Sequence, residues 1–277
     1  MAARAEDLPG FLALVRERVD RELGRILTAG DGAAFGDPGR LREAMRYAVL
    51  GGGKRIRPVV VVAAAQAARG RLEQALPAAC AVELLHAYTL VHDDLPAMDD
   101  DDERRGKPTV HVAFGVWPAI LVGDALLTEA FACLAGLGPA APEALRVLAR
   151  RAGVRELLAG QARDLAGETW RASLETIEDI HAQKTGALFA AAAELGALSA
   201  GADAAARGRL AGFGMALGVA FQHADDLADA DHPEHRERAR RRVGELVVDA
   251  KSACAPFGAT MLPLLADWVA SMTERPG

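Results

Sequence analysis

The chain has 277 residues, of which 51% are hydrophobic and 25% charged, as expected of a soluble globular protein with a substantial buried core. Its formal charge of -6 argues against nucleic acid as a partner, because a phosphate backbone requires a basic surface. Cys80, Cys133 and Cys254 are widely spaced and lack a partner motif, so they indicate neither a disulfide framework nor a zinc site and suit a reducing cytoplasm.

The N-terminal sequence MAARAEDLPG carries acidic residues where a signal peptide needs a basic region. The sequence also lacks a run of about 18 uninterrupted apolar residues, the length that a membrane-spanning helix requires. We therefore expect a cytoplasmic protein without stable membrane insertion.

Helical periodicity accounts for most of the chain. Apolar residues recur at helical spacing over residues 8–27, and the segment GDGAAFGDPG then breaks the pattern. Residues 59–68 are almost wholly apolar and small, which predicts a central helix. Pro96 predicts that the helix over residues 73–92 ends before the acidic stretch that follows it. The predicted helices span residues 8–27, 41–50, 59–68, 73–92, 117–137, 141–166, 174–199, 204–229, 235–255 and 260–272.

The sequence shows no alternating strand pattern of useful length and no linker, which predicts one all-α domain spanning residues 1–277. Gly212, Gly214 and Gly218 lie inside the predicted helix 204–229, where each costs up to about 1 kcal/mol relative to alanine. They indicate close approach of either a neighbouring helix or a ligand, and the sequence favours neither.

The stretch HDDLPAMDDDDERRGKPTVH, residues 92–111, is the most charged part of the chain. Seven acidic residues lie between Asp93 and Glu103, and Arg104, Arg105 and Lys107 follow them. Such a run is usually a solvated loop. A second acidic cluster far along the chain favours a site instead.

That second cluster is FQHADDLAD, residues 221–229, which ends the predicted helix 204–229. Asp225, Asp226 and Asp229 are three and four residues apart, so their carboxylates can converge on one side of a helix. Carboxylate oxygens with open coordination positions suit magnesium, which accepts substrate phosphate oxygens as further ligands. Two facing clusters would form a clamp for metal ions around a diphosphate.

Basic motifs supply groups that could bind the phosphates. The sequence GGGKRIRP presents Lys54, Arg55 and Arg57 after a glycine turn, although a basic helix start is often only a surface feature. In KTG, Lys184 and Thr185 lie within an otherwise apolar helix, where an unpaired lysine is costly and a ligand is the favoured explanation.

Several other polar residues have a structural alternative. Gln161, Asp164 and Gln222 lie on apolar helices and are each more often satisfied core residues than ligands. His86 lies two helical turns before Asp93 and could reach a bound anion. The remaining candidates, which show no metal-ligand spacing and are interpreted as structural, are His92, His111 and His223.

With GGGKRIRP, HDDLPAMDDDDERRGKPTVH, GDALLTEAF, QARDL, KTG and FQHADDLAD in this order, the chain resembles the trans-type isoprenyl diphosphate synthases of the farnesyl diphosphate synthase family. The resemblance covers about residues 40–229. It implies an all-α bundle around a deep central cavity, usually homodimeric, with both acidic motifs at the cavity mouth.

The resemblance also implies a role for individual residues, which we carry over by position. It implies that two magnesium ions are held by Asp93, Asp94 and Asp99, and a third by the motif of Asp225, Asp226 and Asp229, with manganese as an alternative. It implies that the allylic diphosphate and its metal shell contact Arg104, Lys184, Thr185 and Gln222. It implies that isopentenyl diphosphate is bound by Lys54, Arg57, His86 and Arg105. The residues expected to act in catalysis are Asp93, Asp94, Asp99, Arg104, Lys184 and Asp225.

The implied reaction is the head-to-tail condensation of isopentenyl diphosphate with a C5 or C10 allylic diphosphate. Tyr88 and Thr89 lie about one turn before Asp93, where a bulky residue acts as a floor in this family. The two extra residues in DDLPAMD, compared with DDxxD, and Tyr88 resemble the bacterial farnesyl type, so we predict a C15 product. A C20 or C10 product is the alternative.

The chain departs from the family after Asp229, where it reads ADHPEHRERARRRVGELVVDAK and lacks the family's longer lysine-containing loop. A substitute could come from the basic run at residues 236–242, although this run is more typical of a solvated helix face. A class I terpene cyclase is disfavoured because it has no use for a second diphosphate site. A non-catalytic subunit of a heteromeric synthase remains a further alternative.

Overall fold

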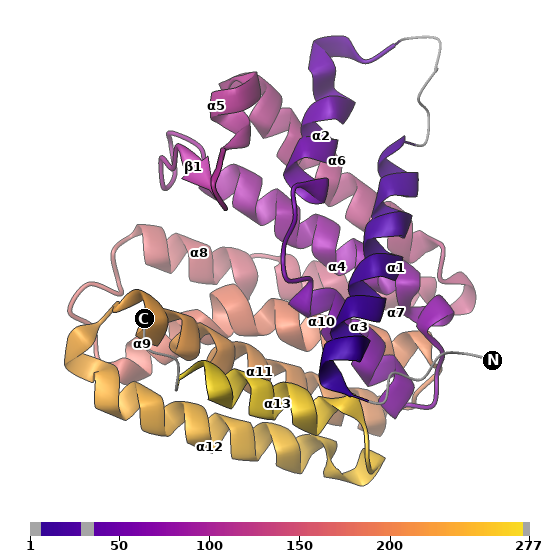
Figure 1. Ribbon diagram of the computed structural model, residues 1–277, viewed down its shortest axis with the longest axis vertical. Coiled ribbons are helices and arrows are strands. Elements are labelled where there is room, and N and C mark those ends of the chain that lie inside the picture. Colours follow the sequence, from indigo (N-terminus) through magenta and orange to yellow (C-terminus); the bar gives the residue numbers. More distant parts are fainter. Residues whose placement is uncertain (1–6, 29–35, 274–277) are drawn as a thin grey trace.

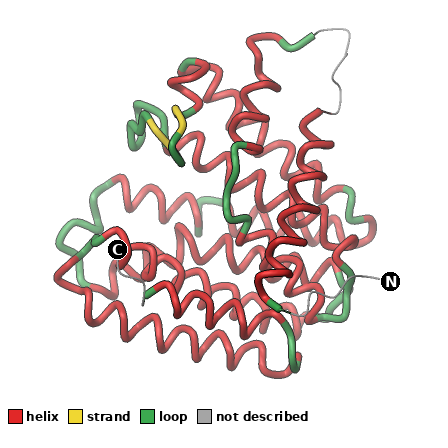
Figure 2. Tube along the Cα trace, viewed as in Figure 1, coloured by secondary structure: helices red, strands yellow, loops and turns green. Residues whose placement is uncertain are grey.

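Helices form almost all of the computed structural model, which describes residues 7–28 and 36–273 (Figures 1 and 2). This confirms the predicted all-α class. The first half of the chain contains α1 (Leu8–Thr28), η1 (Pro38–Arg40), α2 (Leu41–Leu50), α3 (Ile56–Ala67), α4 (Leu72–Asp93), α5 (Val110–Phe114) and α6 (Val116–Ala135). A short hairpin lies between α4 and α5. Its strands, β1 (Glu103–Arg104) and β2 (Lys107–Pro108), have two residues each.

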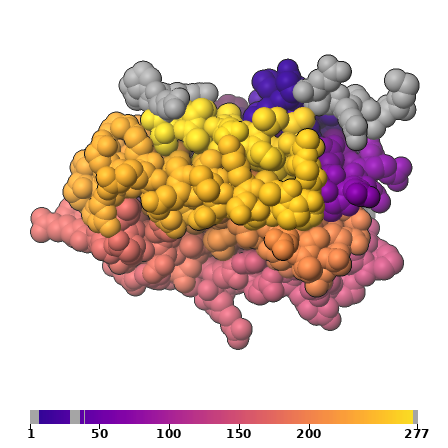
Figure 3. All heavy atoms as spheres, turned by 90° about the horizontal axis from the view of Figure 1, so that it is seen from below, coloured from indigo at the N-terminus to yellow at the C-terminus, as the bar shows by residue number. Residues whose placement is uncertain are grey.

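The second half begins with a 3-10 turn, η2, and ends with two helices that pack on the rest of the bundle. Its elements are η2 (Gly138–Ala140), α7 (Ala141–Ala152), α8 (Leu157–Leu165), α9 (Leu174–His181), η3 (Ala182–Gly186), α10 (Ala187–Ser199), α11 (Ala204–Asp229), η4 (Pro233–His235), α12 (Arg236–Cys254), η5 (Ala255–Phe257) and α13 (Met261–Met272). Figure 3 shows the face that α12 and α13 cover.

The core is organised around α3 and α10, which lie side by side in the middle of the bundle (Figure 1). Both consist largely of small apolar residues that are fully buried. A side chain at Gly196 of α10 would place its Cβ 2.1 Å from the carbonyl oxygen of Val61 of α3. The two backbones can approach this closely only because the residue is glycine.

Glycines also explain how α11 packs against α10. A Cβ at Gly214 would lie 2.3 Å from the carbonyl oxygen of Phe189, and one at Gly218 would lie 2.8 Å from the Cβ of Phe189. These two glycines therefore admit a neighbouring helix rather than a ligand, which settles the choice that the sequence left open for them. At Gly212 an added Cβ would meet open space, so packing does not explain that glycine.

The structure differs from the predicted elements in three details. The predicted helix 141–166 is two helices, because α7 ends before Gly153 and α8 begins at Leu157. The predicted helix 174–199 is interrupted by the π-helical turn η3, which contains the KTG motif. The hairpin within the acidic stretch has two residues per strand, too few for an alternating pattern to show in the sequence.

Two helices, α4 and α6, are long and apolar enough to cross a membrane by length and composition alone. Such helices also occur in the cores of soluble proteins, and α4 is one of the bundle's interior helices. By contrast, α6 exposes Trp117, Ile120 and Leu121 on one face, with Trp117 61% exposed. This apolar face of α6 lacks a cover in the described part of the chain.

Candidate active site

A cavity of about 850 Å³ lies inside the bundle and collects most of the residues that the sequence singled out. Its walls come from α1, α3, α4, α8, η3 and α11. The predicted site residues that line it are Lys54, Arg57, His86, Tyr88, Thr89, Asp93, Asp99, Arg104, Arg105, Lys184, Thr185, Gln222 and Asp225. Asp94, Asp226 and Asp229 do not line it.

The first acidic motif lies where α4 ends. After Asp93 the chain turns back on itself, and the backbone N–H of Asp99 donates to the carbonyl oxygen of Asp93 over 2.9 Å. This turn places both carboxylates at the cavity. Burial, with Asp99 nearby, raises the pKa of Asp93 to about 6 despite the opposing charge of Lys184, and burial also raises the pKa of Asp99.

Asp94 has a different position from the one expected of a metal ligand. Its side chain is buried, accepts a hydrogen bond from Nε of Arg104 over 2.7 Å and forms an ion pair with an Nη of the same arginine at 2.6 Å. Burial disfavours the charge of Arg104, but the carboxylate of Asp94 outweighs this and raises the arginine pKa. Asp94 therefore lies beside Arg104 and not on the cavity wall, and its role as a metal ligand stays a prediction.

The second acidic motif divides in the same way. Asp225 lines the cavity, and burial together with the charge of Asp229 raises its pKa. Asp226 instead accepts a hydrogen bond from Gln222 over 2.9 Å and lies 3.2 Å from His181. Asp229 is exposed at the end of α11. Of the three predicted ligands, only Asp225 lines the cavity, and the metal-binding roles of Asp226 and Asp229 stay predictions.

Two residues of α8 hold the site together, and the sequence assigned them no role in it. Gln161 donates from Nε2 to Asp93 over 2.9 Å, and Asp164 accepts from the ammonium of Lys184 over 2.6 Å. Their spacing of three residues in QARDL was the available signal, because it places both on one side of a helix. Close packing of α8 on η3 depends on Gly160, where a Cβ would lie 2.4 Å from the backbone nitrogen of Lys184.

Thr185 and Gln222 form one polar group on the cavity wall. The hydroxyl of Thr185 donates to Gln222 Oε1 over 2.9 Å, while Gln222 Nε2 donates to Asp226. A carboxylate only accepts hydrogen bonds, so Asp226 fixes the orientation of the Gln222 amide. The Thr185 hydroxyl is thereby directed at Gln222 and presents its lone pairs to the cavity.

Four groups near the start of α3 and the hairpin form the second cationic part of the cavity. Arg57 is stacked 5.0 Å from the centre of the Phe189 ring, and its buried Nε has no hydrogen-bond partner. Burial lowers the pKa of Arg57 to about 10, so it remains charged at neutral pH. Burial and neighbouring guanidinium groups hold the pKa of His86 well below its usual range, which makes it a neutral hydrogen-bonding group. Lys54 is exposed, and Arg105 donates to the carbonyl oxygen of Gly52.

Arg55 does not belong to this cationic group, although the sequence offers it beside Lys54 and Arg57. Its guanidinium donates to Asp20 over 2.7 Å, to Glu83 over 2.6 Å and to the carbonyl oxygen of Val49 over 2.6 Å, so each of its three nitrogens already has a partner. The side chain is 2% exposed. Arg55 therefore joins α1 and α4 to the start of α3, and its charge is offset by two carboxylates.

The cavity's carboxylates fit a divalent metal ion. Asp93, Asp99 and Asp225 are oxygen donors of the kind that magnesium binds, and the raised pKa of each shows that its negative charge is incompletely compensated by the protein. They come from two walls, at the ends of α4 and α11. A cation bound between these walls would reduce the electrostatic repulsion among the three carboxylates.

The basic run that follows Asp229 does not reach the cavity. Arg238 pairs with Glu175 and Arg242 with Glu178, both on α9, while Arg240 pairs with Glu237 on its own helix. None of the arginines at 236, 238 and 240–242 lines the cavity. The hypothesis that this run replaces the family's missing lysine is therefore wrong for the described conformation.

Tyr88 and Thr89 also line the cavity, and their role as its floor stays a prediction. The Tyr88 ring contacts the ring of His92 edge to face, with centroids 5.2 Å apart. His92 in turn lies 3.0 Å from the carbonyl oxygen of Ile120 and packs directly on Gly123, where an added Cβ would meet its ring at 2.0 Å. His92 thus braces Tyr88 against α6.

Comparisons with known proteins agree with this geometry. The polyprenyl synthetase family model matches residues 38–243. The dimethylallyltranstransferase of Fischerella ambigua is 38% identical over an alignment of 298 residues, which covers 97% of this chain and 84% of that protein. The farnesyl diphosphate synthase of Geobacillus stearothermophilus is 40% identical over 82% of this chain and 76% of its own length. The crystal structure of an FPP/GFPP synthase from Zymomonas mobilis is 39% identical, covers 95% of this chain and 97% of its own, and superposes with a TM-score of 0.81. The chain therefore belongs to the polyprenyl synthetase family.

Proposed function

We propose that this protein is a prenyltransferase that condenses isopentenyl diphosphate head to tail with a C5 or C10 allylic diphosphate and releases diphosphate. One observation carries the proposal. Carboxylates on two walls of one cavity, Asp93 and Asp99 on one side and Asp225 on the other, face a cavity that also contains two separate sets of basic groups. Two sets suit two diphosphates.

The residues divide the work between the two substrates. Arg104 and Lys184, held by Asp94 and Asp164, would bind the allylic diphosphate near the carboxylates. Lys54, Arg57, Arg105 and the neutral His86 would bind isopentenyl diphosphate. Magnesium or manganese ions held by Asp93, Asp99 and Asp225 would, when bound, neutralise charge on the leaving diphosphate.

The chemistry needs no protein nucleophile. The allylic carbon–oxygen bond breaks with its electron pair going to the diphosphate, and the double bond of isopentenyl diphosphate supplies the pair for the new carbon–carbon bond. A proton then leaves the isopentenyl unit, and the departing diphosphate can accept it. Fixed cations stabilise the charge that develops on the leaving group, and the apolar cavity excludes the water that would trap the carbocation.

A C15 product is proposed from the braced floor of the cavity. Tyr88 lines the cavity and its ring packs on His92, so we expect a longer tail to collide with these two rings. A C20 product, or a C10 product, is the alternative. Purified protein supplied with magnesium, isopentenyl diphosphate and C5, C10 or C15 primers should yield a C15 diphosphate from the two shorter primers. Failure to form a product from any primer would reject the proposed prenyltransferase activity. A cyclic hydrocarbon formed from one substrate would favour a cyclase.

We also propose that the protein is a cytoplasmic homodimer whose interface includes the apolar face of α6. Val116, Trp117, Ile120 and Leu121 are all exposed there, and a contiguous apolar face of this kind usually marks a contact. Light scattering should give the mass of two chains. Replacing Leu121 with lysine should shift the protein toward the mass of one chain, while the same change at the isolated exposed Val248 should not.

A further inference from the structure

A second polar cluster lies outside the cavity, where α9 meets α11. It consists of His181, at the end of α9, and of His223 and Asp226 on α11. Each residue offers one ligand atom, and these atoms all lie within 4.8 Å of one another. None of the three lines the cavity, although Asp225 on the same helix does. We call this the His–His–Asp cluster.

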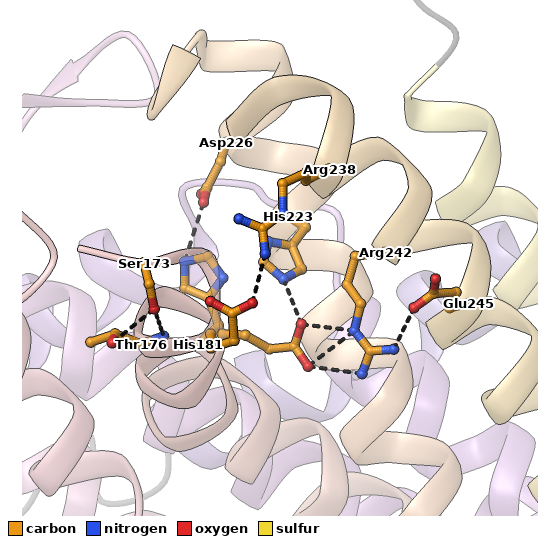
Figure 4. Close-up of polar contacts among 10 residues, drawn as sticks. Ser173, Thr176, His181, His223, Asp226, Arg238, Arg242 and Glu245 are labelled. Carbon is orange, nitrogen blue, oxygen red and sulfur yellow. Dashed lines mark hydrogen bonds and ion pairs between the residues drawn. The ribbon is translucent and has the colours of Figure 1, made fainter. Parts of the chain in front are cut away.

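One ring nitrogen of the cluster, Nδ1 of His181, has no hydrogen-bond partner. His181 is 7% exposed, and its Nδ1 is buried without a hydrogen-bond partner, while Nε2 lies 3.2 Å from Asp226. In Figure 4 a dashed line joins Asp226 to the His181 ring, with His223 beside it, and the two imidazole centroids are 4.8 Å apart. A buried polar atom without a partner is unfavourable, and a ligand would satisfy it.

A carboxylate on α9 orients one of the two imidazoles of the cluster. His223 Nε2 lies 3.4 Å from Glu178, and Arg242 on α12 fixes that carboxylate through hydrogen bonds of 2.8 and 2.9 Å (Figure 4). A carboxylate that orients a histidine from behind is typical of metal sites, and here it leaves the other ring nitrogen of His223 for an ion.

We propose that the His–His–Asp cluster binds a transition-metal ion of the zinc class, separate from the ions of the cavity. Two imidazole nitrogens and one carboxylate oxygen suit zinc or cobalt, whereas magnesium prefers oxygen ligands alone. Bonds of about 2.0–2.2 Å place tetrahedral ligand atoms roughly 3.4 Å apart, so the cluster must contract by about an ångström. A small hollow lined by Asp231 and His232 adjoins the cluster and leaves room for a fourth ligand such as water.

An ion in this place would reach the cavity through a single residue. Asp226 can give one oxygen to the ion and keep the other on Gln222 Nε2, whose amide oxygen accepts from Thr185. The metal would therefore tie α9 to α11 directly behind the Thr185–Gln222 pair. This proposal does not depend on which prenyl product the cavity makes.

Cobalt is the appropriate probe, because tetrahedral Co²⁺ absorbs visible light and zinc displaces it. The full chain, freed of metal and held in excess magnesium to occupy the cavity carboxylates, should develop visible bands on titration with Co²⁺ that Zn²⁺ then abolishes. His223→Gln should weaken Co²⁺ binding at least tenfold. His111→Gln removes a buried histidine on α5, far along the chain from the cluster, and should leave binding unchanged.

A second variant protects the test against a folding defect. Glu178→Gln keeps both histidines but removes the carboxylate that orients His223, and it should weaken Co²⁺ binding about 10-fold or more. Melting curves without metal would show that each variant is folded. Equal Co²⁺ affinity in the wild-type protein and His223→Gln, or no visible bands in the wild type, would overturn the proposal. The magnesium-dependent condensation assay is measured separately, so its failure would leave this result intact.

Discussion

Replacing Arg55 with methionine should destabilise the fold strongly, although its neighbour Lys54 should tolerate the same change. The Arg55 and Glu83 side chains are 2% and 5% exposed and lie 2.6 Å apart. Removing the arginine leaves the carboxylate of Glu83 buried without its main partner, which costs about 3–5 kcal/mol. Domains of this kind are stable by about 5–15 kcal/mol, so the loss is a large share of the total.

Urea unfolding followed by circular dichroism measures this loss, provided that the slope of the transition is unchanged. Adding Glu83→Leu to Arg55→Met should recover much of the stability, because the buried charge is then removed. The Lys54→Met control changes an exposed lysine on the same loop and should alter stability by less than about 0.5 kcal/mol. It should instead weaken the use of isopentenyl diphosphate.

A loss below about 1 kcal/mol for Arg55→Met would refute this reasoning, since it would mean that Glu83 is not held by Arg55 or is readily solvated. A double variant that is no more stable than Arg55→Met alone would contradict the assignment of the loss to a buried charge. In either case Arg55 would again be a candidate for phosphate binding.

Three further predictions concern the cavity floor, the metal ions and the contact of α12 with α9. Tyr88→Ala should shift the product from C15 toward longer chains, measured by chromatography of the dephosphorylated alcohols, and an unchanged product would remove Tyr88 from the floor. Chelation should abolish condensation, and adding back magnesium should restore it; activity that survives in the chelator would contradict the roles of Asp93 and Asp225. Arg242→Met should lower the free energy of unfolding by about 1 kcal/mol near neutral pH. Burial opposes the ionisation of Glu178, but Arg242 outweighs it and depresses the pKa, so this stabilisation is present above the carboxyl's unfolded-state pKa and lost as the pH falls through the depressed value. If the free energy of unfolding of Arg242→Met stayed below that of the wild type at acidic pH as well, Arg242 would stabilise the fold by packing instead.

The sequence was sufficient for the fold class because the helices are periodic and the central ones are almost wholly small and apolar. It was also sufficient to find Asp93, Asp99 and Asp225, since clustered carboxylates at helix ends are costly unless they bind cations. The break at Gly153 and the π-helical turn at Lys184 were not predictable in this way. The π-helical turn lies where α8 packs against η3, a contact that local periodicity does not record.

Arg55 shows what residue type alone cannot decide. Lys54, Arg55 and Arg57 are equally basic, and nothing local distinguishes them. Their partners are distant in sequence, since Glu83 lies on α4 and Asp20 on α1. Only the tertiary fold reveals that every nitrogen of the Arg55 guanidinium has a partner while the buried Nε of Arg57 has none.

The paired aspartates follow one rule that spacing could not reveal. Successive residues of an α-helix point about 100° apart, so two adjacent carboxylates point in different directions. At each motif the first aspartate, Asp93 or Asp225, lines the cavity. The second, Asp94 or Asp226, is turned into the protein and holds another cavity residue, Arg104 in one motif and Gln222 in the other.

This division separates two consequences of mutation within each pair. Asparagine at Asp225 removes a negative charge from the cavity, so it should lower turnover in proportion to the lost affinity for metal, and high magnesium should partly restore it. Asparagine at Asp226 leaves the cavity charge intact but can present its amide to Gln222, which frees the Thr185 hydroxyl to rotate. That variant should have lower turnover that magnesium does not restore. Equal rescue of both variants by magnesium would show that the second aspartate also faces the ions.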